Sequence, residues 1–543
     1  MLFCTGRTEY IPLYFSSAPI SSIAFSLTLD PLSYTFRRPF LNRWIDVETV
    51  QELTIYIEVE IKDMSNKEDL ALMAHLFRRI GFGASREELD EYLDDGYEQT
   101  VEGLLNTSPV SPVDDALIRR YHPDHSTTHD TSGAGSYLLY RLVATKSPLI
   151  EKMAFFWSNI FATGYAKVTN GKPLSDQFRT YRTYGMGRLD DLLLQLSRDP
   201  AMIIWLDNID NHNNAINENY GRELLELFSM GVGNYTEDDI KECSRAFTGW
   251  TIANADYIKE LAVRNSIFPY GKLAWDYEYN EDDHDSGIKT FLGETGNFNG
   301  EDIIRIICEQ PATARFIARH IYHFFVADEP PVPQWPYEDP KDIEAIEMLE
   351  KAYFDSDHNI KEMLRVLLLS KFFKSEKCRF AKVKSPVELV TGVLKLTEEF
   401  PGPNIKITER NQQISFMGQT LFNPPSVEGW HQGLEWIETG SLTERVNFAS
   451  EQLGDNTKVG IKKIVRKVTE DEDAYISSEA YVDRCLEQLG ALEASPPIRE
   501  TLIKYADENG LADINLSNDG PEAERKVYSL LSVIGFMPEF QRC

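Results

Sequence analysis

The sequence predicts a mainly α fold: a large multi-helix body with a few short strands or extended loops. Apolar residues recur at helical spacing along most of the chain, and many of these stretches begin at a helix-capping residue and stop at glycine. Strand-like alternation is rare, and its clearest case is residues 275–279, where aromatic and acidic residues alternate. Helix packed on helix is therefore the expected architecture.

Composition narrows the classes of function. The chain has 543 residues, of which 42% are hydrophobic, enough for two to four domains or one large helical body with insertions. Its formal net charge is -31, and because nucleic acids and anionic membranes bind basic surfaces, we expect neither as a partner. No apolar run approaches the roughly eighteen residues that a transmembrane helix needs.

The six cysteines are widely spaced and form no Cys-x-x-Cys pair. This spacing argues against a disulfide framework or a structural zinc site. Isolated thiols in a reducing compartment are the simpler interpretation. Because no signal peptide is visible either, the expected location is cytoplasmic.

Residues 1–63 differ in character from the rest of the chain. They hold short apolar pieces without a helical period, whereas a periodic helix begins after Met64, behind a capping box formed by Ser65 and Glu68. We predict that residues 1–63 are a poorly ordered, non-native upstream extension and that Met64 is the biological start.

Helices are then predicted in order along the chain. Capping boxes open the helices at 65–80, 85–94 and 236–247. Further helices are predicted at 136–142, 148–161, 189–196, from Pro200 onward, and at 301–308, 311–325, 342–353, 360–369, 386–396, 459–470, 478–490 and 521–534. The helix at 148–161 is apolar nearly all round and is therefore expected to be central.

The most informative stretch is residues 217–233, which has a helical pattern that stops at glycine. Tyr220 falls on the apolar side. The opposite side carries one amide, one guanidinium and two carboxylates, from Asn219, Arg222, Glu223 and Glu226. This face is either a solvated surface with a Glu–Arg pair or a buried site. In a buried site the two glutamates would act as acid and base or as metal ligands, and Arg222 would orient an anionic group.

Two further motifs could contribute to a site. His284 and Asp285 lie in a turn with Gly287, where a histidine beside an acid can be positioned as a base or ligand. The alternative is an Asx-type turn. Lys289 either holds an anion or pairs with an acid. Trp430 ends a rigid Pro- and Gly-containing loop, either as a stacking platform for a sugar or as packing on the core.

Histidines elsewhere are weaker candidates. His75 lies on an amphipathic helix beside Arg78 and Arg79, and it is either a site residue or a core histidine with one hydrogen bond. The loop at 103–130 holds three histidines that could bind a metal, but its composition provides no scaffold: His122, His125 and His129. No GxSxG, P-loop, GxGxxG or HExxH pattern is present.

Six motifs occur in a set order: HLFRRIGFG (75–83), EKMAFFWSNIFATG (151–164), NENYGRELLELFSMGVGNYTEDDIKECSRAFTGW (217–250), HDSGIKTFLG (284–293), PATARFIARHIYHFF (311–325) and NPPSVEGW (423–430). Together they resemble the bacterial family catalogued as domain of unknown function 1800. The resemblance covers about Leu70 to Arg445 and reaches the closing MPEFQ. We expect a helical family domain over 64–450 with an inserted loop region at 251–300. The acidic composition of residues 451–543 indicates a separate helical region packed on that domain.

The resemblance implies no established activity. Family genes often neighbour a second family that looks like a sulfatase or alkaline phosphatase relative, so the product of such a sulfatase-like gene is an expected partner. Many members carry export signals. The family typically has histidine where this chain has Ser158, and often a second one at Ile160. His320 and His323 replace family-typical basic residues, and we interpret both as packing or surface substitutions.

The residues support two functional hypotheses. The first is a hydrolase or lyase acting on a polar, carbohydrate-like substrate, with or without a divalent metal ion. Its catalytic residues would be Glu223, Glu226, His284 and Asp285; its substrate contacts Asn219, Tyr220, Arg222, Lys289 and Trp430; and its further candidates His75, Arg78 and Arg79. The second is a non-enzymatic scaffold or partner protein in which the same residues form a buried ion-pair network. Convergence on an open cavity would favour the first, and carboxylates engaged by arginines would favour the second.

Overall fold

The computed structural model describes residues 66–108, 131–253, 275–330, 338–470 and 475–543. The described residues are mostly helical and include two small two-stranded sheets, so the predicted class is confirmed. The proposed upstream extension, the Ser65 cap and the three histidines of the 103–130 loop lie outside these residues.

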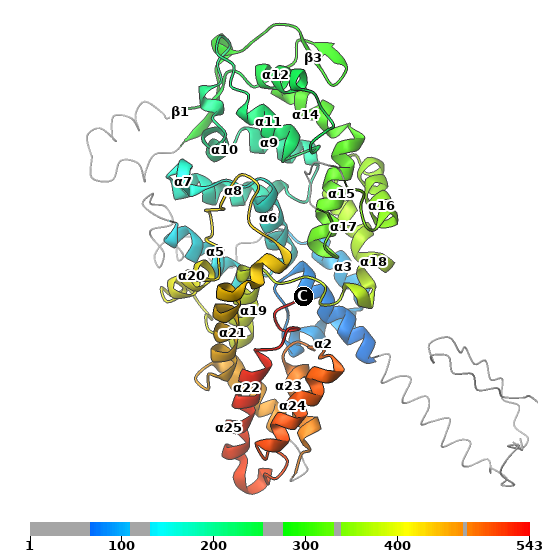
Figure 1. Ribbon diagram of the computed structural model, residues 1–543, viewed down its shortest axis with the longest axis vertical. Coiled ribbons are helices and arrows are strands. Elements are labelled where there is room, and N and C mark those ends of the chain that lie inside the picture. Colours follow the sequence, from blue (N-terminus) through cyan, green and yellow to red (C-terminus); the bar gives the residue numbers. More distant parts are fainter. Residues whose placement is uncertain (1–65, 109–130, 254–274, 331–337, 471–474) are drawn as a thin grey trace, which may run out of the picture. The chain divides into compact units, whose positions relative to one another are not determined.

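The first part of the fold is entirely helical (Figure 1). A helix over residues 66–80 is followed by α2 (Arg86–Asp95), α3 (Tyr97–Leu105), α5 (Ser132–Ala144), α6 (Pro148–Ile160), α7 (Tyr165–Val168), α8 (Gly171–Tyr184), α9 (Leu189–Ser197), α10 (Pro200–Trp205) and the 3-10 helix η3 (Asn208–Asp210).

The middle part combines helices with the two hairpin-like sheets. It contains α11 (Asn219–Glu226), α12 (Glu237–Ala246), β1 (Trp250–Ala253), β2 (Asp276–Tyr279), η5 (Glu281–Asp283), β3 (Lys289–Phe291), β4 (Glu294–Gly296), α14 (Gly300–Cys308), α15 (Pro311–Phe325), α16 (Ile343–Asp355), α17 (Ile360–Leu369), α18 (Lys371–Lys374) and η6 (Glu376–Cys378). β1 pairs with β2 and β3 with β4, both antiparallel. The alternating stretch at 275–279, for which a strand and an extended loop were both expected alternatives, forms the strand β2.

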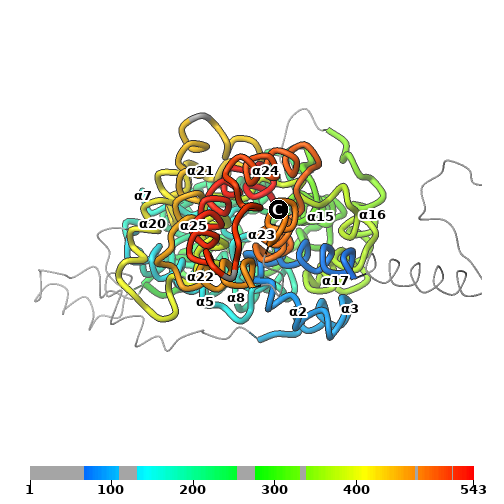
Figure 2. The backbone as a smooth tube through the Cα atoms, turned by 90° about the horizontal axis from the view of Figure 1, so that it is seen from below, coloured from blue at the N-terminus to red at the C-terminus, as the bar shows by residue number. Residues whose placement is uncertain are grey.

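The last part returns to helices: α19 (Pro386–Thr397), α20 (Ile407–Phe416), η7 (Gly433–Ile437), α21 (Thr439–Gly454), α22 (Val459–Thr469), α23 (Ser478–Gln488), α24 (Pro496–Glu508) and α25 (Leu516–Ile534). α22, α23, α24 and α25 lie side by side (Figure 2), and α19 contacts both α21 and α22. The domain boundary expected near residue 450 falls inside α21, which runs from Thr439 to Gly454.

Helix α6 is central, as its composition predicts. Every residue of α6 except Asn159 is buried. The two adjacent charges on this helix are both paired. Glu151 accepts hydrogen bonds from Arg182 Nε at 2.8 Å and Arg141 Nη2 at 3.3 Å. Lys152 pairs with Glu388 of α19. Pairing is required because an unpaired buried charge is costly.

Helix α11 is fixed by close packing on its apolar side. A Cβ atom at Gly221 would lie 2.2 Å from Ser244 Oγ of α12, so only glycine allows this approach. The Tyr220 hydroxyl lies 2.5 Å from Ser197 Oγ of α9, and its ring packs edge-on against Phe247. These contacts turn Glu223 and Glu226 away from the core.

The helix predicted for 217–233 is shorter than its pattern indicates. It ends at Glu226, because the amides beyond Leu227 bond to carbonyls more than four residues back. Phe228 N donates to Glu223 O at 3.1 Å, and Gly231 N donates to Leu225 O at 3.1 Å. Seven of the described α-helices were not predicted: α3, α7, α8, α18, α20, α21 and α24.

Replacing Gly221 by alanine tests the α11–α12 packing. Ser244 can rotate its hydroxyl, but two backbone atoms, Ile240 O and Ser244 N, would remain at 3.1 Å from the new Cβ. We expect Gly221→Ala to lower the free energy of unfolding by about 1–3 kcal/mol, as overpacking does.

The matched control is Gly103→Ala in α3, where a Cβ would meet nothing within 4 Å. Because alanine favours the helix, this variant should gain about 0.5–1 kcal/mol. Denaturant unfolding measures both variants, and equal effects would show that the close approach at Gly221 is not tight.

Candidate functional site

Two carboxylates lie one turn apart on the polar face of α11. Glu226 Oε2 accepts a hydrogen bond from the Tyr235 hydroxyl at 3.2 Å. Glu223 is half-buried, and among the described residues it has no hydrogen-bond or ion-pair partner. Burial, and then the neighbouring charge of Glu226, raise the pKa of the Glu223 carboxyl from 4.5 to about 7. A carboxyl in this range can exchange a proton at neutral pH.

A third carboxylate, on the loop at 423–430, acts on Glu223 through its charge. The charge of Glu428 also raises the pKa of Glu223. The loop is anchored on α6, because Asn159 Oδ1 accepts a hydrogen bond from Trp430 N at 3.0 Å. At Gly429, with φ +91°, a Cβ would lie 2.4 Å from Asn159 O. Sequence reasoning named Trp430 but missed Glu428, although both belong to the same motif.

The other polar residues of α11 have partners of their own. Arg222 donates to both carboxylate oxygens of Glu237, at 3.1 and 2.8 Å. Asn219 Nδ2 donates to Asp207 Oδ2 at 3.1 Å. Tyr220 is 2% exposed and packs in the core. Arg222 thus pairs with Glu237 and not with Glu223 or Glu226. Tyr220 packs on the apolar side of α11, away from the two carboxylates.

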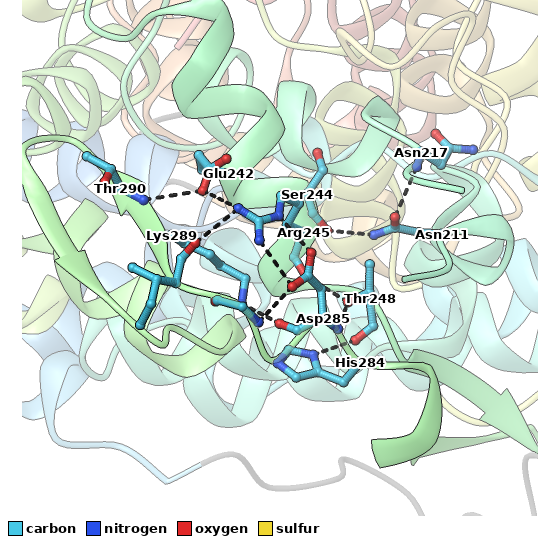
Figure 3. A network of polar contacts seen from close by, with 12 residues as sticks. Asn211, Asn217, Glu242, Ser244, Arg245, Thr248, His284, Asp285, Lys289 and Thr290 are labelled. Carbon is cyan, nitrogen blue, oxygen red and sulfur yellow. Dashed lines mark hydrogen bonds and ion pairs between the residues drawn. The ribbon is translucent and has the colours of Figure 1, made fainter. Parts of the chain in front are cut away.

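The His284–Asp285 turn belongs to a second network (Figure 3). Arg245 of α12 holds Asp285 in a two-point contact, Nε to Oδ2 at 2.7 Å and Nη2 to Oδ1 at 3.1 Å. The pKa of Asp285 is lowered by this contact. Gly287 N donates to Asp285 Oδ1 at 2.8 Å, which is the geometry of an Asx turn.

The neighbours of Asp285 are held by backbone carbonyls. His284 Nδ1 donates to Thr248 O at 2.9 Å. Lys289 is fully buried and donates to Asp285 O and to Gly287 O, the latter at 3.2 Å. Burial lowers the pKa of Lys289. The described contacts of this network are those of a rigid turn.

The two networks touch only indirectly. Asn211 donates to Ser244 O at 2.8 Å and accepts from Asn217 N at 3.0 Å, so it connects α12 with the start of α11 (Figure 3). Within the described residues no hydrogen bond or ion pair joins Glu223 or Glu226 to His284 or Asp285. The four predicted catalytic residues therefore do not form one directly bonded cluster.

The residues of the first helix are also set apart. His75 is fully buried, donates from Nε2 to Phe373 O at 3.1 Å, and has its pKa lowered by burial. Arg79 donates from Nη2 to Val326 O at 3.0 Å and Cys378 O at 2.5 Å. Arg78 donates to Gly490 O and Ala491 O. This position of His75 matches the core-histidine alternative.

Trp430 lines a small cavity of about 70 Å³ on the other side of its loop. Residues from four of the sequence motifs meet there, including Phe82, Lys152, Phe155 and Phe324, together with Glu388 of α19. Trp430 is 7% exposed, and its Nε1 has no partner among the described residues. The burial of Trp430 fits loop packing, whereas its unpaired Nε1 and its place in the cavity lining fit a ligand-facing position. Neither alternative is therefore excluded.

Three of the positions at which the sequence was expected to depart from the family pattern make packing contacts. Ser158 Oγ donates to Phe155 O at 2.8 Å, and Ile160 is 6% exposed. His323 Nε2 donates to Gln432 Oε1 at 2.7 Å, and burial lowers its pKa to about 4. Among the described residues no group of three or more His, Cys, Asp or Glu side chains is arranged to hold a metal ion.

The fold and the site define a large helical protein with a carboxylate pair on one short helix. The chain belongs to the family described as Protein of unknown function (DUF1800), whose model matches residues 75–542. No curated protein and no solved structure matches it. Across the described parts of the chain, no helix is both long and apolar enough to cross a membrane.

The raised pKa of Glu223 predicts a pH-dependent stability. The folded protein holds a proton on this carboxyl between pH 4.5 and about 7 that the unfolded chain has lost. The contribution of the protonated Glu223 carboxyl to the free energy of unfolding is therefore full below pH 4.5 and is lost as the pH rises through 7. We expect this loss to be about 1 kcal/mol, allowing for solvent screening of a half-exposed group.

Denaturant unfolding at pH 5 and pH 8 provides the measurement. The quantity of interest is the free energy of unfolding of wild type minus that of Glu223→Gln. We expect this difference to be smaller at pH 8 than at pH 5. Glu500→Gln, at an exposed position of α24, is the control and should show no such change. A constant difference between wild type and Glu223→Gln would contradict the assignment.

Proposed function

We propose that this protein is a hydrolase or lyase in which the Glu223–Glu226 pair performs acid–base chemistry. The observation that carries the proposal is the different environment of the two carboxylates. Glu226 is held by a phenol, whereas Glu223 is half-buried without a partner among the described residues. Two carboxyls with separated environments can divide the roles of acid and base.

In this proposal Glu223 is the proton donor. Its carboxyl remains partly protonated at neutral pH, because burial and the charges of Glu226 and Glu428 disfavour ionisation. It would give its proton to the leaving oxygen of the substrate. Glu226 would accept a proton from the attacking water in a hydrolase, or from the carbon next to the leaving oxygen in a lyase, and the Tyr235 hydroxyl would orient it.

Charge supports a neutral substrate. Three carboxyls gather at this face, from Glu223, Glu226 and Glu428, and the nearby guanidinium of Arg222 is engaged by Glu237. An anionic substrate would be repelled by this arrangement, and a neutral one such as a carbohydrate would not. Arg222 was expected to orient an anionic group of the substrate. In this proposal it instead pairs with Glu237 and links α11 to α12.

The test is a screen of neutral oligosaccharides and polysaccharides with the full chain, read out as newly formed chain ends. Glu223→Gln should lower any turnover by about 10²–10⁴-fold, the usual contribution of a positioned acid. The activity of wild type should also fall as the pH rises above 7, because Glu223 then loses its proton.

Asp238→Asn is the matched control, since Asp238 is an exposed acid in the first turn of the adjacent helix α12. It should leave turnover unchanged. Turnover that survives in Glu223→Gln at the wild-type level would rule out the proposed proton donor.

A second candidate is a scaffold that works with the product of a neighbouring sulfatase-like gene. The two-point contact between Arg245 and Asp285 and the contact between Arg222 and Glu237 favour it, because they engage in ion pairs two residues that the sequence had assigned to an enzyme's site. Copurification of the two proteins, lost when the α12 surface is altered, would support it.

A further inference from the structure

A second cavity, of about 50 Å³, lies between the end of the first helix, α19 and the segment after α23. Three cationic side chains line it: Arg78, Lys384 and Lys395. A single water needs about 10–15 Å³ of such space, so the cavity has room for an ion of four or five heavy atoms. This cavity is separate from the α11 carboxylates.

Arg78 provides the first unmet donors. It is 8% exposed, and its Nη1 donates to Gly490 O at 3.1 Å and Ala491 O at 3.3 Å. Its Nε and Nη2 are buried without a partner among the described residues. A guanidinium has a planar fork of donors that fits two oxygens of one anion, so this side chain is suited to an oxyanion.

The two lysines are also incompletely bonded. Lys384 Nζ donates to Phe540 O at 2.8 Å, and Lys395 Nζ donates to Gly83 O at 2.9 Å. Each contact uses one of the three donors of an ammonium group, and a backbone carbonyl carries no full charge. Burial lowers the pKa of Lys384 to about 8 and also lowers that of Lys395.

Three carboxylates near the cavity have partners elsewhere. Glu388 lines the same cavity but pairs with Lys152. Glu493 pairs with Arg379 at 3.3 Å, and Glu88 accepts from Ser85 N at 2.8 Å. Within the described residues no ion pair reaches any of the three cations that line the cavity. Arg78 is buried and the two lysines are partly buried. Cations withdrawn from water without a paired charge are costly, so in a chain of net charge -31 their presence favours an anionic ligand.

We infer that this cavity is a binding site for a small tetrahedral oxyanion, phosphate or sulfate, either free or as the end group of a larger molecule. The anion accepts from Nε and Nη2 of Arg78 and from the ammonium groups of Lys384 and Lys395. It neutralises the three cations together and so joins the first helix to α19.

The full chain, freed of phosphate and sulfate, is titrated with inorganic phosphate, inorganic sulfate and glycerol phosphate by calorimetry and by thermal unfolding. We expect saturable binding to one site and a midpoint of unfolding that rises with anion concentration. Tighter binding of glycerol phosphate would identify the end group of a larger molecule, whereas tighter binding of the inorganic ions would identify a free ion.

Lys384→Met and Lys395→Met should each weaken binding by at least about tenfold, because each removes a charged hydrogen bond. Lys526→Met is the control, since Lys526 also donates to a backbone carbonyl, Gly510 O, but lies on α25. Circular dichroism checks the fold of each variant. Absence of saturable binding to the folded wild type overturns the inference, as does equal binding by wild type and both cavity variants.

Discussion

The adjacent charges of α6 impose the strongest constraint on this fold. A helix buried on nearly every side carries Glu151 beside Lys152, and each charge needs a partner from another helix. Glu151 is bonded by Arg141 of α5 and Arg182 of α8, and Lys152 by Glu388 of α19. Because these partners lie on three different helices, the two charges fix how α5, α8 and α19 are arranged around the centre.

The same helix also positions the proposed chemistry. Asn159, the residue of α6 that is not buried, binds the backbone of Trp430 and closely approaches Gly429. This contact holds the loop whose Glu428 charge reaches Glu223. On the far side, Gly221 lets α11 approach α12 closely enough to fix its polar face. The unusual proton affinity of Glu223 is thus a product of packing on both sides, not of α11 alone.

Local patterns were sufficient to predict the central helix and the capping boxes at Ser85 and Thr236, since these depend on residues close in sequence. The polar face of α11 was predicted for the same reason. Long-range contacts were not predictable. The pairing of Asp285 with Arg245 joins residues forty positions apart, and nothing in the sequence placed Glu428 near Glu223. Helices such as α8 were missed because their apolar residues are interrupted by many polar ones.

The most direct test of the account follows the Glu223 carboxyl itself by ¹³C NMR across the pH range, in protein labelled at glutamate side chains. Its signal is identified by its absence from Glu223→Gln. We expect a Glu223 pKa of about 7 in wild type and a lower pKa in Glu226→Gln, where the like charge is removed. A Glu223 pKa near 4.5, unchanged by loss of the Glu226 charge, would contradict the account.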